Sequence, residues 1–234
     1  MRRWIRLLGT VLVVLGVLTL VWAGVVWRWQ DPFTALYTTW RQHQLTSQYE
    51  KRFEAFNAPT PGTSVAAERR NIAREAKRYR LESKRGDAIG RIRAPGMGIN
   101  MILVNGTDHE TLKKGPGRDL RTFMPGENRL VYIAGHRTTY LAPFSHIDRL
   151  QPGDRITIEV PYATFIYSVT HHRIVKATDL SVLRSPLHEQ LELQACHPRF
   201  FATHRYIAYA RLIRVEPRGA APYDATEVAQ ASGK

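Results

Sequence analysis

The sequence contains a single cysteine, Cys196, among 234 residues. This excludes an internal disulfide, so the thiol must be a leftover group, a packed apolar residue or a reactive one. A zinc site of the Cys/His type is excluded too, because it needs several such ligands at short spacings. Composition alone does not decide among the three roles of the thiol.

Acidic residues are scarce: 20 Asp and Glu face 34 Lys and Arg, which leaves a formal net charge of +14. Lys and Arg neutralise phosphates, so this excess is compatible with nucleic-acid binding. The membrane topology predicted from the N-terminal segment puts most of these charges outside the cell, and no nucleic-acid partner is expected. The most basic stretch, residues 68–93, is interpreted as a solvated face, with anionic lipid or wall polymer as the alternative.

Charged residues are absent from Leu7–Trp27. As a helix this segment rises roughly 31 Å, close to the ~30 Å hydrocarbon thickness of a bilayer. Three arginines, Arg2, Arg3 and Arg6, precede it and resist translocation, so residues 1–30 are predicted to be a single-pass anchor with a cytoplasmic N-terminus and the rest outside. A cleaved signal peptide ending near Val21-Trp22-Ala23 is the alternative, but the apolar run continues beyond it.

Residues 31–86 are predicted to form a helical, basic stalk. Asp31-Pro32 is a typical helix start, and apolar residues then recur near helical spacing as far as Phe56. A Pro- and Gly-containing break at 58–64 separates a second predicted helix, which ends before Gly86. With so few apolar residues, the segment is expected to be a connector outside the core.

Residues 87–216 change to short apolar runs separated by turn signals, which indicates an all-β barrel or sandwich. Apolar residues alternate with polar ones through Ile156–Val160, as in a strand with one buried face. Short helices are predicted at 108–114 and 143–150, and residues 217–234 are expected to be a loosely ordered tail. The predicted strand runs are 89–92, 99–104, 130–134, 156–160, 163–175, 191–195 and 206–215.

Strand parity separates Cys196 from the apolar face of its own strand. Leu191, Leu193 and Ala195 share one face of the run 190–196, and Cys196 lies on the other. A core cysteine would lie with the leucines, so the alternation favours a chemical role. A thiol ordinarily has a pKa of about 8.5 and attacks as the thiolate, so it needs a nearby base or cation.

His136 is the histidine best placed to be that base. It follows the buried run 130–134 and Gly135, where a polar ring at a strand end is a candidate site residue. His171 and His172 are adjacent in a strand and point to opposite faces, so they are a poor metal pair. The remaining histidines show no ligand spacing and are expected to be ordinary surface groups.

Two segments resemble the sortase family. They are AGHRTTYLAPFSHIDRLQPGDRI, residues 134–156, and LQACHPRFFATHRYIAYARL, residues 193–212. The first resembles the family's Gly-His-Arg loop, and the second its strand-end cysteine followed nine residues later by arginine. The resemblance extends over about residues 87–215 and implies a closed eight-stranded barrel of the sortase type.

By this resemblance Cys196 is the nucleophile, His136 the general acid and base, and Arg205 the donor to the oxyanion or the substrate. The family cleaves a C-terminal LPXTG-like sorting signal of secreted proteins between Thr and Gly. It then transfers the acyl group to an amine of the peptidoglycan precursor or of a pilin. No cofactor or metal is implied. His197 and His204, next to these residues, are expected to face away from Cys196.

Residues 115–127 resemble the segment that class E sortases, an actinobacterial type, write as GPGHYPGTxxPGE. This chain has Asp119 at the position of the tyrosine, which the class uses for substrate recognition in accepting LAXTG-type signals. Asp119 is therefore expected to alter the accepted signal. The substrate-binding residues implied by the resemblance are Ala134, Gly135, Arg137, Thr138, Ala195 and Asp119.

The sequence disfavours two further interpretations and leaves a third open. A papain-like hydrolase is disfavoured, because its helix-borne cysteine signature is missing. Calcium binding is not supported, because Asp179 and Glu189 are the only carboxylates of the loop 173–191 and do not form a dense cluster. A non-catalytic, sortase-like barrel that binds signal peptides or envelope partners stays open, and it predicts an unreactive Cys196.

Overall fold

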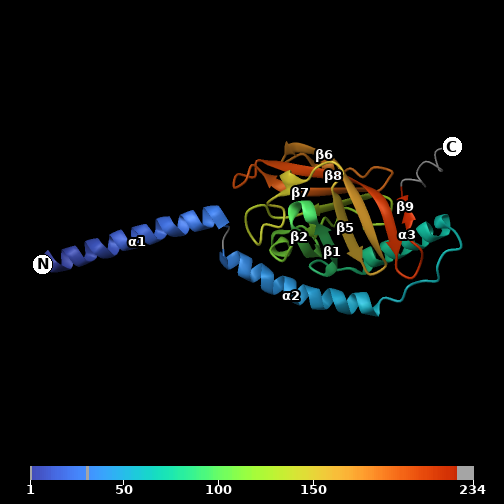
Figure 1. The fold of residues 1–234 in the computed structure, drawn as a ribbon, viewed down its shortest axis with the longest axis horizontal. Helices are drawn as coiled ribbons and strands as arrows, with labels where there is room; N and C mark the ends of the chain where they lie inside the picture. The colour runs from blue at the N-terminus through green and yellow to red at the C-terminus, as the bar shows by residue number, and fades with distance from the viewer. Residues whose placement is uncertain (1, 30–31, 226–234) are drawn as a thin grey trace.

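The computed structural model describes residues 2–29 and 32–225, with three helices leading into a strand-rich body (Figure 1). The helices are α1 (Arg2–Trp29), α2 (Pro32–Ala55) and α3 (Val65–Glu82). The strands are β1 (Ala88–Ala94), β2 (Ile99–Asn105), β3 (Gly117–Arg118), β4 (Leu130–Ala134), β5 (Arg155–Val160), β6 (Ala163–Lys176), β7 (Gln190–His197), β8 (His204–Pro217) and β9 (Tyr223–Asp224). Short helical turns, α4 (His109–Leu112), η1 (Pro95–Met97), η2 (Ile147–Arg149) and η3 (Leu180–Leu183), connect them.

The first eight strands close into a barrel. Their order is β6-β5-β1-β2-β3-β4-β7-β8, and an additional pairing of β6 with β8 completes the ring. Two of the pairings, β2 with β3 and β4 with β7, are parallel, and the others are antiparallel. The predicted closed eight-stranded barrel is confirmed, although the sequence pattern missed the two-residue strands β3 and β9.

The barrel interior is filled by one face of each strand. Ile156, Ile158 and Val160 of β5 are buried, and the residues between them are more exposed, as the alternation predicted. Leu191 and Leu193 of β7 join the same core cluster. Burying one such side chain stabilises the fold by about 1.5–3 kcal/mol, so this cluster holds the barrel together.

Helix α1 is the one described helix that is long and apolar enough to cross a membrane, judged by length and composition. Its apolar window, Arg2–Val25, has a mean hydropathy of 2.4 and makes no contact that buries it. In Figure 1 it extends away from the barrel. The helix is compatible with a single-pass membrane anchor, and the predicted cap role of Asp31 lies outside the described residues.

Helix α2 packs on the barrel, which corrects the expectation that residues 31–86 stay outside the core. Leu45 and Tyr49 form a buried cluster with residues of β1 and β2. The side-chain amide of Gln42 accepts from Ile102 N (2.7 Å) and donates to Ile102 O (3.1 Å) and to Lys114 O (2.7 Å). Gln42 thus pairs with β2 where the short β3 leaves its backbone unpaired.

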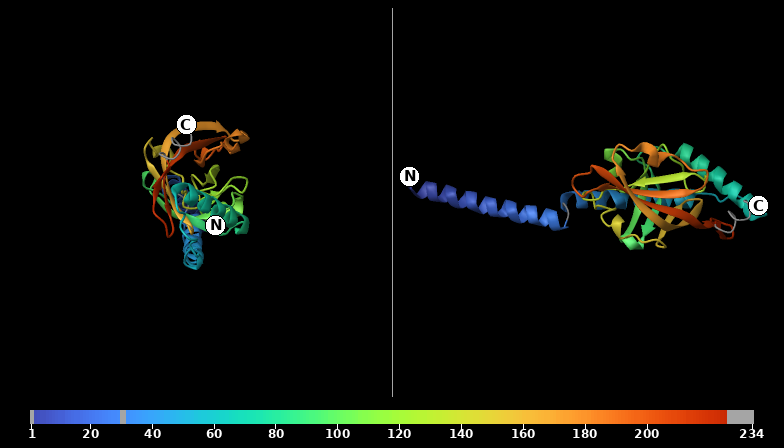
Figure 2. Two further views of the ribbon diagram at one scale, coloured as in Figure 1. Left: turned by 90° about the vertical axis from the view of Figure 1, so that its right-hand side faces the viewer. Right: turned by 90° about the horizontal axis from the view of Figure 1, so that it is seen from above.

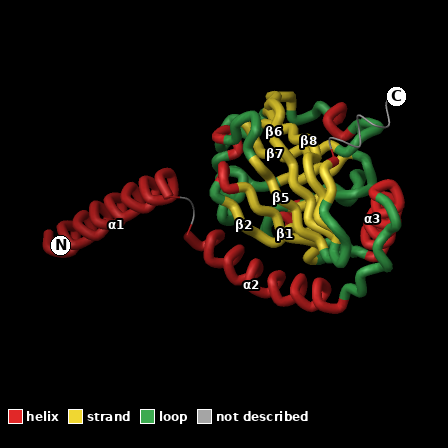
Figure 3. Tube along the Cα trace, turned by 45° about the vertical axis from the view of Figure 1, so that its right-hand side comes forward, coloured by secondary structure: helices red, strands yellow, loops and turns green. Residues whose placement is uncertain are grey.

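Helix α3 covers the barrel end farther from α1 (Figure 2, left; Figure 3). Ser64 caps its N-terminus, and its Ile72 and Ala76 belong to the main core cluster. Arg80 near its C-terminus makes a two-point ion pair with Glu127, at 2.7 and 3.1 Å. The sequence pattern underestimated this helix because only a narrow stripe of an otherwise basic surface is buried.

The predicted loosely ordered tail begins with a strand. Tyr223 and Asp224 form β9, which pairs with Val215 and Arg214 of β8, so this part of the prediction was wrong. Tyr223 also packs against the main core cluster. Residues 226–234 of the predicted tail lie outside the described part of the chain.

Candidate functional site

Cys196 lies in a cleft of about 290 Å³ at the barrel end where β4 and β7 finish and β8 begins. The cleft is on the outer face of these strands, under η3 and the loops that follow β2 and β3. Its lining residues are Thr107, Leu112, Asp119, Arg121, Tyr132, Ala134, Gly135, His136, Ala177, Asp179, Leu180, Val182, Leu183, Gln194, Cys196 and Arg205.

Strand β7 presents Cys196 to this cleft by its parity. Leu193 and Ala195 point into the core and are fully buried, whereas Cys196 is partly exposed and lies outside the core clusters. Gln194, two residues earlier on the same face, also lines the cleft. The thiol is therefore accessible to a ligand, as the strand parity predicted.

His136 is brought beside Cys196 by the parallel pairing of β4 with β7. Ala134 is opposite Gln194, and Gly135 N donates to Gln194 O at 3.0 Å, so both chains then advance two residues to His136 and Cys196. A Cβ at position 135 would lie 2.8 Å from the ring of Phe144. Glycine is therefore required immediately before His136 to let the loop pass over Phe144.

The ring of His136 is largely withdrawn from water. Its Nε2 is buried and has no hydrogen-bond partner among the described residues. Tyr140 lies 5.1 Å and His109 6.4 Å away, between ring centroids. Burial, and secondarily the charge of His109, lower the pKa of His136 below its ordinary 6.5. The neutral imidazole therefore dominates at pH 7, and its unbonded nitrogen is free for a substrate.

Arg205 faces Cys196 directly across the antiparallel pair β7–β8. Its Nη1 donates to Ala202 O at 2.7 Å and to His204 O at 3.0 Å, which fixes the guanidinium at the cleft wall. Within the described residues, Nη2 and Nε donate to no protein acceptor. A guanidinium has five N–H donors, so Arg205 keeps several for an anion or a carbonyl in the cleft.

Arg137 does not line the cleft, although the resemblance assigned it to substrate binding. Its side chain is only 5% exposed and forms an ion pair with Asp148 at 3.3 Å. Its Nη1 donates to Cys196 O (3.2 Å) and is 2.9 Å from His197 Nδ1. Arg137 thus holds the backbone of the strand end that carries the thiol.

Some of the other residues assigned to substrate binding line the cleft and some do not. Ala134, Gly135 and Asp119 line the cleft, whereas Thr138 does not and Ala195 is buried in the barrel core. Because alternate residues of a strand face opposite sides, Ala195 cannot share the cleft with Cys196.

Asp119 and Arg121 form an ion pair in the cleft wall that the sequence analysis did not foresee. The guanidinium contacts both carboxylate oxygens at 3.0 and 2.7 Å, and Arg121 N donates to the same carboxylate at 2.9 Å. Burial by itself would raise the pKa of Asp119, but the bonds and charge of Arg121, with a hydrogen bond from Thr107, outweigh it and lower the pKa. Asp119 therefore stays a carboxylate with its charge compensated.

The sequence also did not predict several other residues that line the cleft, namely Tyr132, Val182 and Leu183. Tyr132 donates from its hydroxyl to Gln194 Oε1 at 3.1 Å, and Val182 and Leu183 of η3 pack over the outer faces of β4 and β8. Strand parity could have found Tyr132, since it has the same parity as Ala134 on β4. Nothing in the sequence pattern indicated where η3 would fold.

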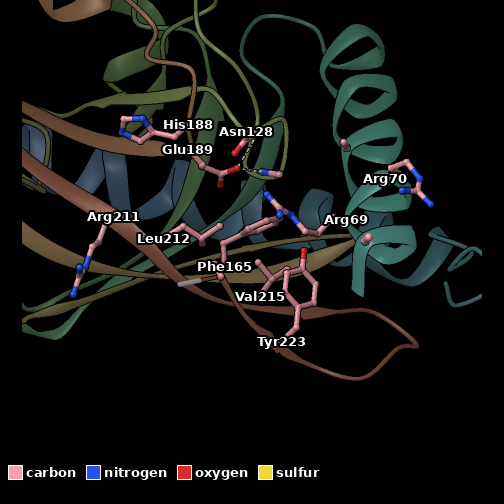
Figure 4. A pocket seen from close by; sticks show the side chains of 14 residues that line it. Arg69, Arg70, Asn128, Phe165, His188, Glu189, Arg211, Leu212, Val215 and Tyr223 are labelled. Carbon is pink, nitrogen blue, oxygen red and sulfur yellow. Dashed lines mark hydrogen bonds between the residues drawn. The ribbon is translucent and has the colours of Figure 1, made fainter. Parts of the chain in front are cut away.

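A larger cavity, of about 710 Å³, lies at the other end of the barrel between α3, β8 and β9 (Figure 4). Phe165, Leu212 and Val215 form its apolar wall, and Arg69 lies beside the hydroxyl of Tyr223. Glu189 turns away toward the backbone of the 126–128 turn, where it accepts from Gly126 N and Asn128 N. In the described part of the chain, no group of three or more His, Cys, Asp or Glu is placed to hold a metal ion.

A closed β-barrel whose cleft joins a strand-end thiol, an unbonded imidazole nitrogen and a guanidinium defines the class of this protein. A family model described as "Sortase domain" matches residues 92–213, just over half of the 234-residue chain. The chain belongs to the sortase family, whose members are cysteine transpeptidases.

Individual relatives agree with this assignment. The chain is 30% identical to Sortase D of Bacillus subtilis (strain 168) over 132 residues, 55% of this chain and 65% of that protein. It is 30% identical to Sortase SrtE1 of Streptomyces coelicolor over 117 residues, 45% of this chain and 33% of that one. The chain thus spans less than two thirds of the length of both relatives. The solved structure of a Clostridium perfringens Sortase D5 transpeptidase superposes with a TM-score of 0.60 at 27% identity, covering 74% of this chain and 98% of that one.

Proposed function

We propose that this chain is an active cysteine transpeptidase in which Cys196, His136 and Arg205 carry the reaction. The observation that supports the proposal most is the parallel β4–β7 register, which sets His136 beside Cys196, with Arg205 opposite it on β8. His136 comes from the loop after β4, Cys196 from the end of β7 and Arg205 from the start of β8, and all three line one cleft.

The chemistry proceeds through a thioester. The Cys196 thiolate attacks the carbonyl carbon of the scissile residue, and donors of Arg205 stabilise the oxyanion that forms. As the peptide C–N bond breaks, the imidazolium of His136 gives its proton to the departing amine. An acceptor amine then attacks the thioester, neutral His136 takes its proton, and the C–S bond breaks to return the thiolate and the imidazolium.

The proposed substrate is a C-terminal sorting signal of LPXTG or LAXTG type on a secreted protein, cut between Thr and Gly. The acceptor is an amine of the peptidoglycan precursor or of a pilin. Class E stays our choice of subclass, supported by the similarity to Sortase SrtE1, although Sortase D is similar over a longer stretch. The Asp119–Arg121 pair stands where the class E pattern has a tyrosine, so the accepted signal is expected to depart from the class preference.

The proposed location is the cell membrane, with α1 as a single-pass anchor, the N-terminus in the cytoplasm and the barrel outside. The support is the apolar window Arg2–Val25 together with Arg2, Arg3 and Arg6 at its N-terminal end. The cationic end resists translocation, so the N-terminus is expected to stay in the cytoplasm and the residues after α1 to lie outside.

The deciding experiment incubates the full chain in detergent with LPXTG and LAXTG peptides and an amine acceptor. Mass spectrometry should detect a thioester on Cys196 and an amide product, both absent with Cys196→Ala. A fragment that begins after α2 is unsuitable, because it lacks the packing of Leu45 and Tyr49 on the barrel.

Two results would count against this function. No adduct with either peptide in a folded preparation would contradict the transpeptidase and favour the non-catalytic peptide-binding barrel. Product formed by Cys196→Ala would contradict the assignment of the nucleophile. Selective alkylation of Cys196 by a small electrophile separates the two functions independently, because only a reactive thiol is labelled rapidly.

A further inference from the structure

The loop between β7 and β8 exposes two phenylalanines next to the candidate site. Phe200 is 64% and Phe201 77% exposed, in the segment that joins Cys196 to Arg205. Phe200 and Ala202 have positive φ values of 72° and 52°, an uncommon backbone conformation for residues other than glycine. The loop therefore holds two large apolar side chains in water, which needs a reason beyond packing.

This loop lies at the same end of the barrel as α1. Arg199 donates to the carbonyl of Ser145, which ties the loop to the segment after His136. That segment is tied in turn to the start of α2, because Tyr140 N donates to Thr34 Oγ1 at 3.2 Å. Figure 1 and Figure 2 (right) show an orange-red loop between strand ends on the side of the barrel that faces α1.

The connection between anchor and barrel is short. Only residues 30 and 31 separate the end of α1 from the start of α2, so the Cα atoms of Trp29 and Pro32 are at most about 11 Å apart. Because α2 is packed on the barrel through Gln42 and Leu45, the barrel cannot move far from the point where α1 leaves the bilayer.

The start of α2 carries a matching surface. Leu36 is 72% exposed, and Tyr37 and Trp40 are exposed beside it, with the Arg41 guanidinium 5.5 Å from the Trp40 ring centroid. Leu36 lies about 6 Å along the helix from Pro32, so this surface is close to the point where the chain leaves α1 and enters the headgroup layer of the bilayer. Tyr and Trp are the residues enriched in that layer, and arginine is favoured beside anionic headgroups.

We propose that the cleft end of the barrel rests on the lipid surface in which α1 is anchored. Phe200 and Phe201 dip into the headgroup layer, the apolar start of α2 lies in the same layer, and Arg199 and Arg41 face the lipid phosphates. The partner is the bilayer itself, because α1 leads directly to this surface. The proposal rests on the membrane anchor of the proposed function but not on its chemistry. It implies that the cleft meets its peptide close to the membrane plane.

The test places an environment-sensitive fluorophore in the loop of the full chain. In a Cys196→Ala background, which removes the natural thiol, Phe201→Cys is labelled and the chain is reconstituted into vesicles of phosphatidylcholine and phosphatidylglycerol. The matched control is Leu187→Cys, an 81% exposed apolar position just before β7, at the opposite end of the barrel. Headgroup-region nitroxide lipid should quench the label at position 201 at least twofold and leave the label at 187 unchanged.

The outcomes separate the anchor from the docking. Equal quenching at positions 201 and 187, in a chain that floats with the vesicles after an alkaline carbonate wash, would overturn the docking alone. A chain that fails to float would overturn the anchor and the docking with it. Neither measurement uses activity, so a failure of the transpeptidase proposal leaves both results intact.

Discussion

The two ends of the barrel differ in how completely their polar groups are bonded. At the α3 end, the larger cavity contains the buried Glu189, whose carboxylate accepts from Tyr167 Oη (2.6 Å), Gly126 N (2.8 Å) and Asn128 N (3.2 Å). At the cleft end, His136 Nε2 is buried without a partner. The buried nitrogen without a partner thus lies in the smaller cavity, which teaches that an unpaired buried polar atom can mark a candidate site better than volume does.

Two arginines show the same contrast. Arg118 is fully buried and bonded to Asn105 Oδ1 and to the carbonyls of Asp119 and Thr122. Its desolvation lowers the pKa to about 10, yet it remains a cation at neutral pH. Among the described residues, Arg205 donates from Nη1 alone, which leaves its remaining donors for the cleft. Arg118 is therefore structural, and Arg205 is available to a ligand.

The largest expected effect is on kcat/KM, when one histidine at each end of the barrel is replaced by glutamine in separate variants. His136→Gln should lower kcat/KM for the signal peptide by about 10²–10⁴-fold, because the proton donor to the departing amine is lost. His188→Gln, at the rim of the α3-end cavity, should leave it unchanged. Steady-state peptide cleavage by both variants measures the difference. A comparable loss from both would mean that the contrast between the ends has no chemical meaning.

The second effect concerns stability at the α3 end. Burial raises the pKa of Glu189 from 4.5 to about 7, against the opposing hydrogen bonds from Tyr167 and from the backbone. The folded chain therefore holds this proton more tightly than the unfolded chain, and the resulting stability is present below pH 4.5 and lost as the pH rises to 7. The free energy of unfolding of the parent, relative to Glu189→Gln, should fall by about 3 kcal/mol across this range.

Urea unfolding in detergent, followed by the near-ultraviolet circular dichroism of the tyrosines, measures this difference. Because the parent and Glu189→Gln both contain Glu192, its contribution cancels in the difference between their unfolding free energies. The pKa of Glu192 is also raised to about 7 by burial. Peptide cleavage at pH 7.5 should be the same for both chains. A pH-independent difference in unfolding free energy would show that folding does not raise the pKa of Glu189.

The smallest expected effect concerns the cleft end alone, where His109 influences the pKa of His136. His109 is exposed beside His136, and its charge contributes to lowering the pKa of that imidazole. His109→Gln should raise the pKa of His136, move the acid limb of the kcat/KM profile to higher pH and change the rate there by about twofold. A profile that superposes on the parent's would exclude electrostatic coupling between the two rings.

The barrel and the three candidate catalytic side chains could be predicted from the sequence because both depend on local patterns. Alternation in β5 and β7 fixed which faces are buried, and the motifs around His136 and Cys196 carried the family resemblance. The core contribution of α2 could not be predicted, since it rests on one glutamine, Gln42, that resembles any polar surface residue until β2 is placed beside it.

The lining of the cleft was predictable only in part. Asp119 was expected there, but its partner Arg121 was not, because their pairing depends on the turn through residues 119–123 that pairs along β4. Arg137 and Ala195 were expected to bind substrate but do not line the cleft, since neighbours in sequence to a site residue on an extended chain tend to point to the opposite side. Parity, applied to the neighbours as it was to Cys196, would have excluded Ala195.

The closed ring has a consequence for how a peptide can be held. Many domains bind an extended peptide by letting it join a free sheet edge as one more strand, with main-chain bonds supplying the affinity. Here β6 pairs with β8, and the amide of Gln42 occupies the backbone of β2 at Ile102 beside the short β3. Because these strand edges are already hydrogen-bonded, we expect a peptide in the cleft to be bound by side chains and loop amides. Selectivity should therefore change through single residues of the cleft without any change in the barrel.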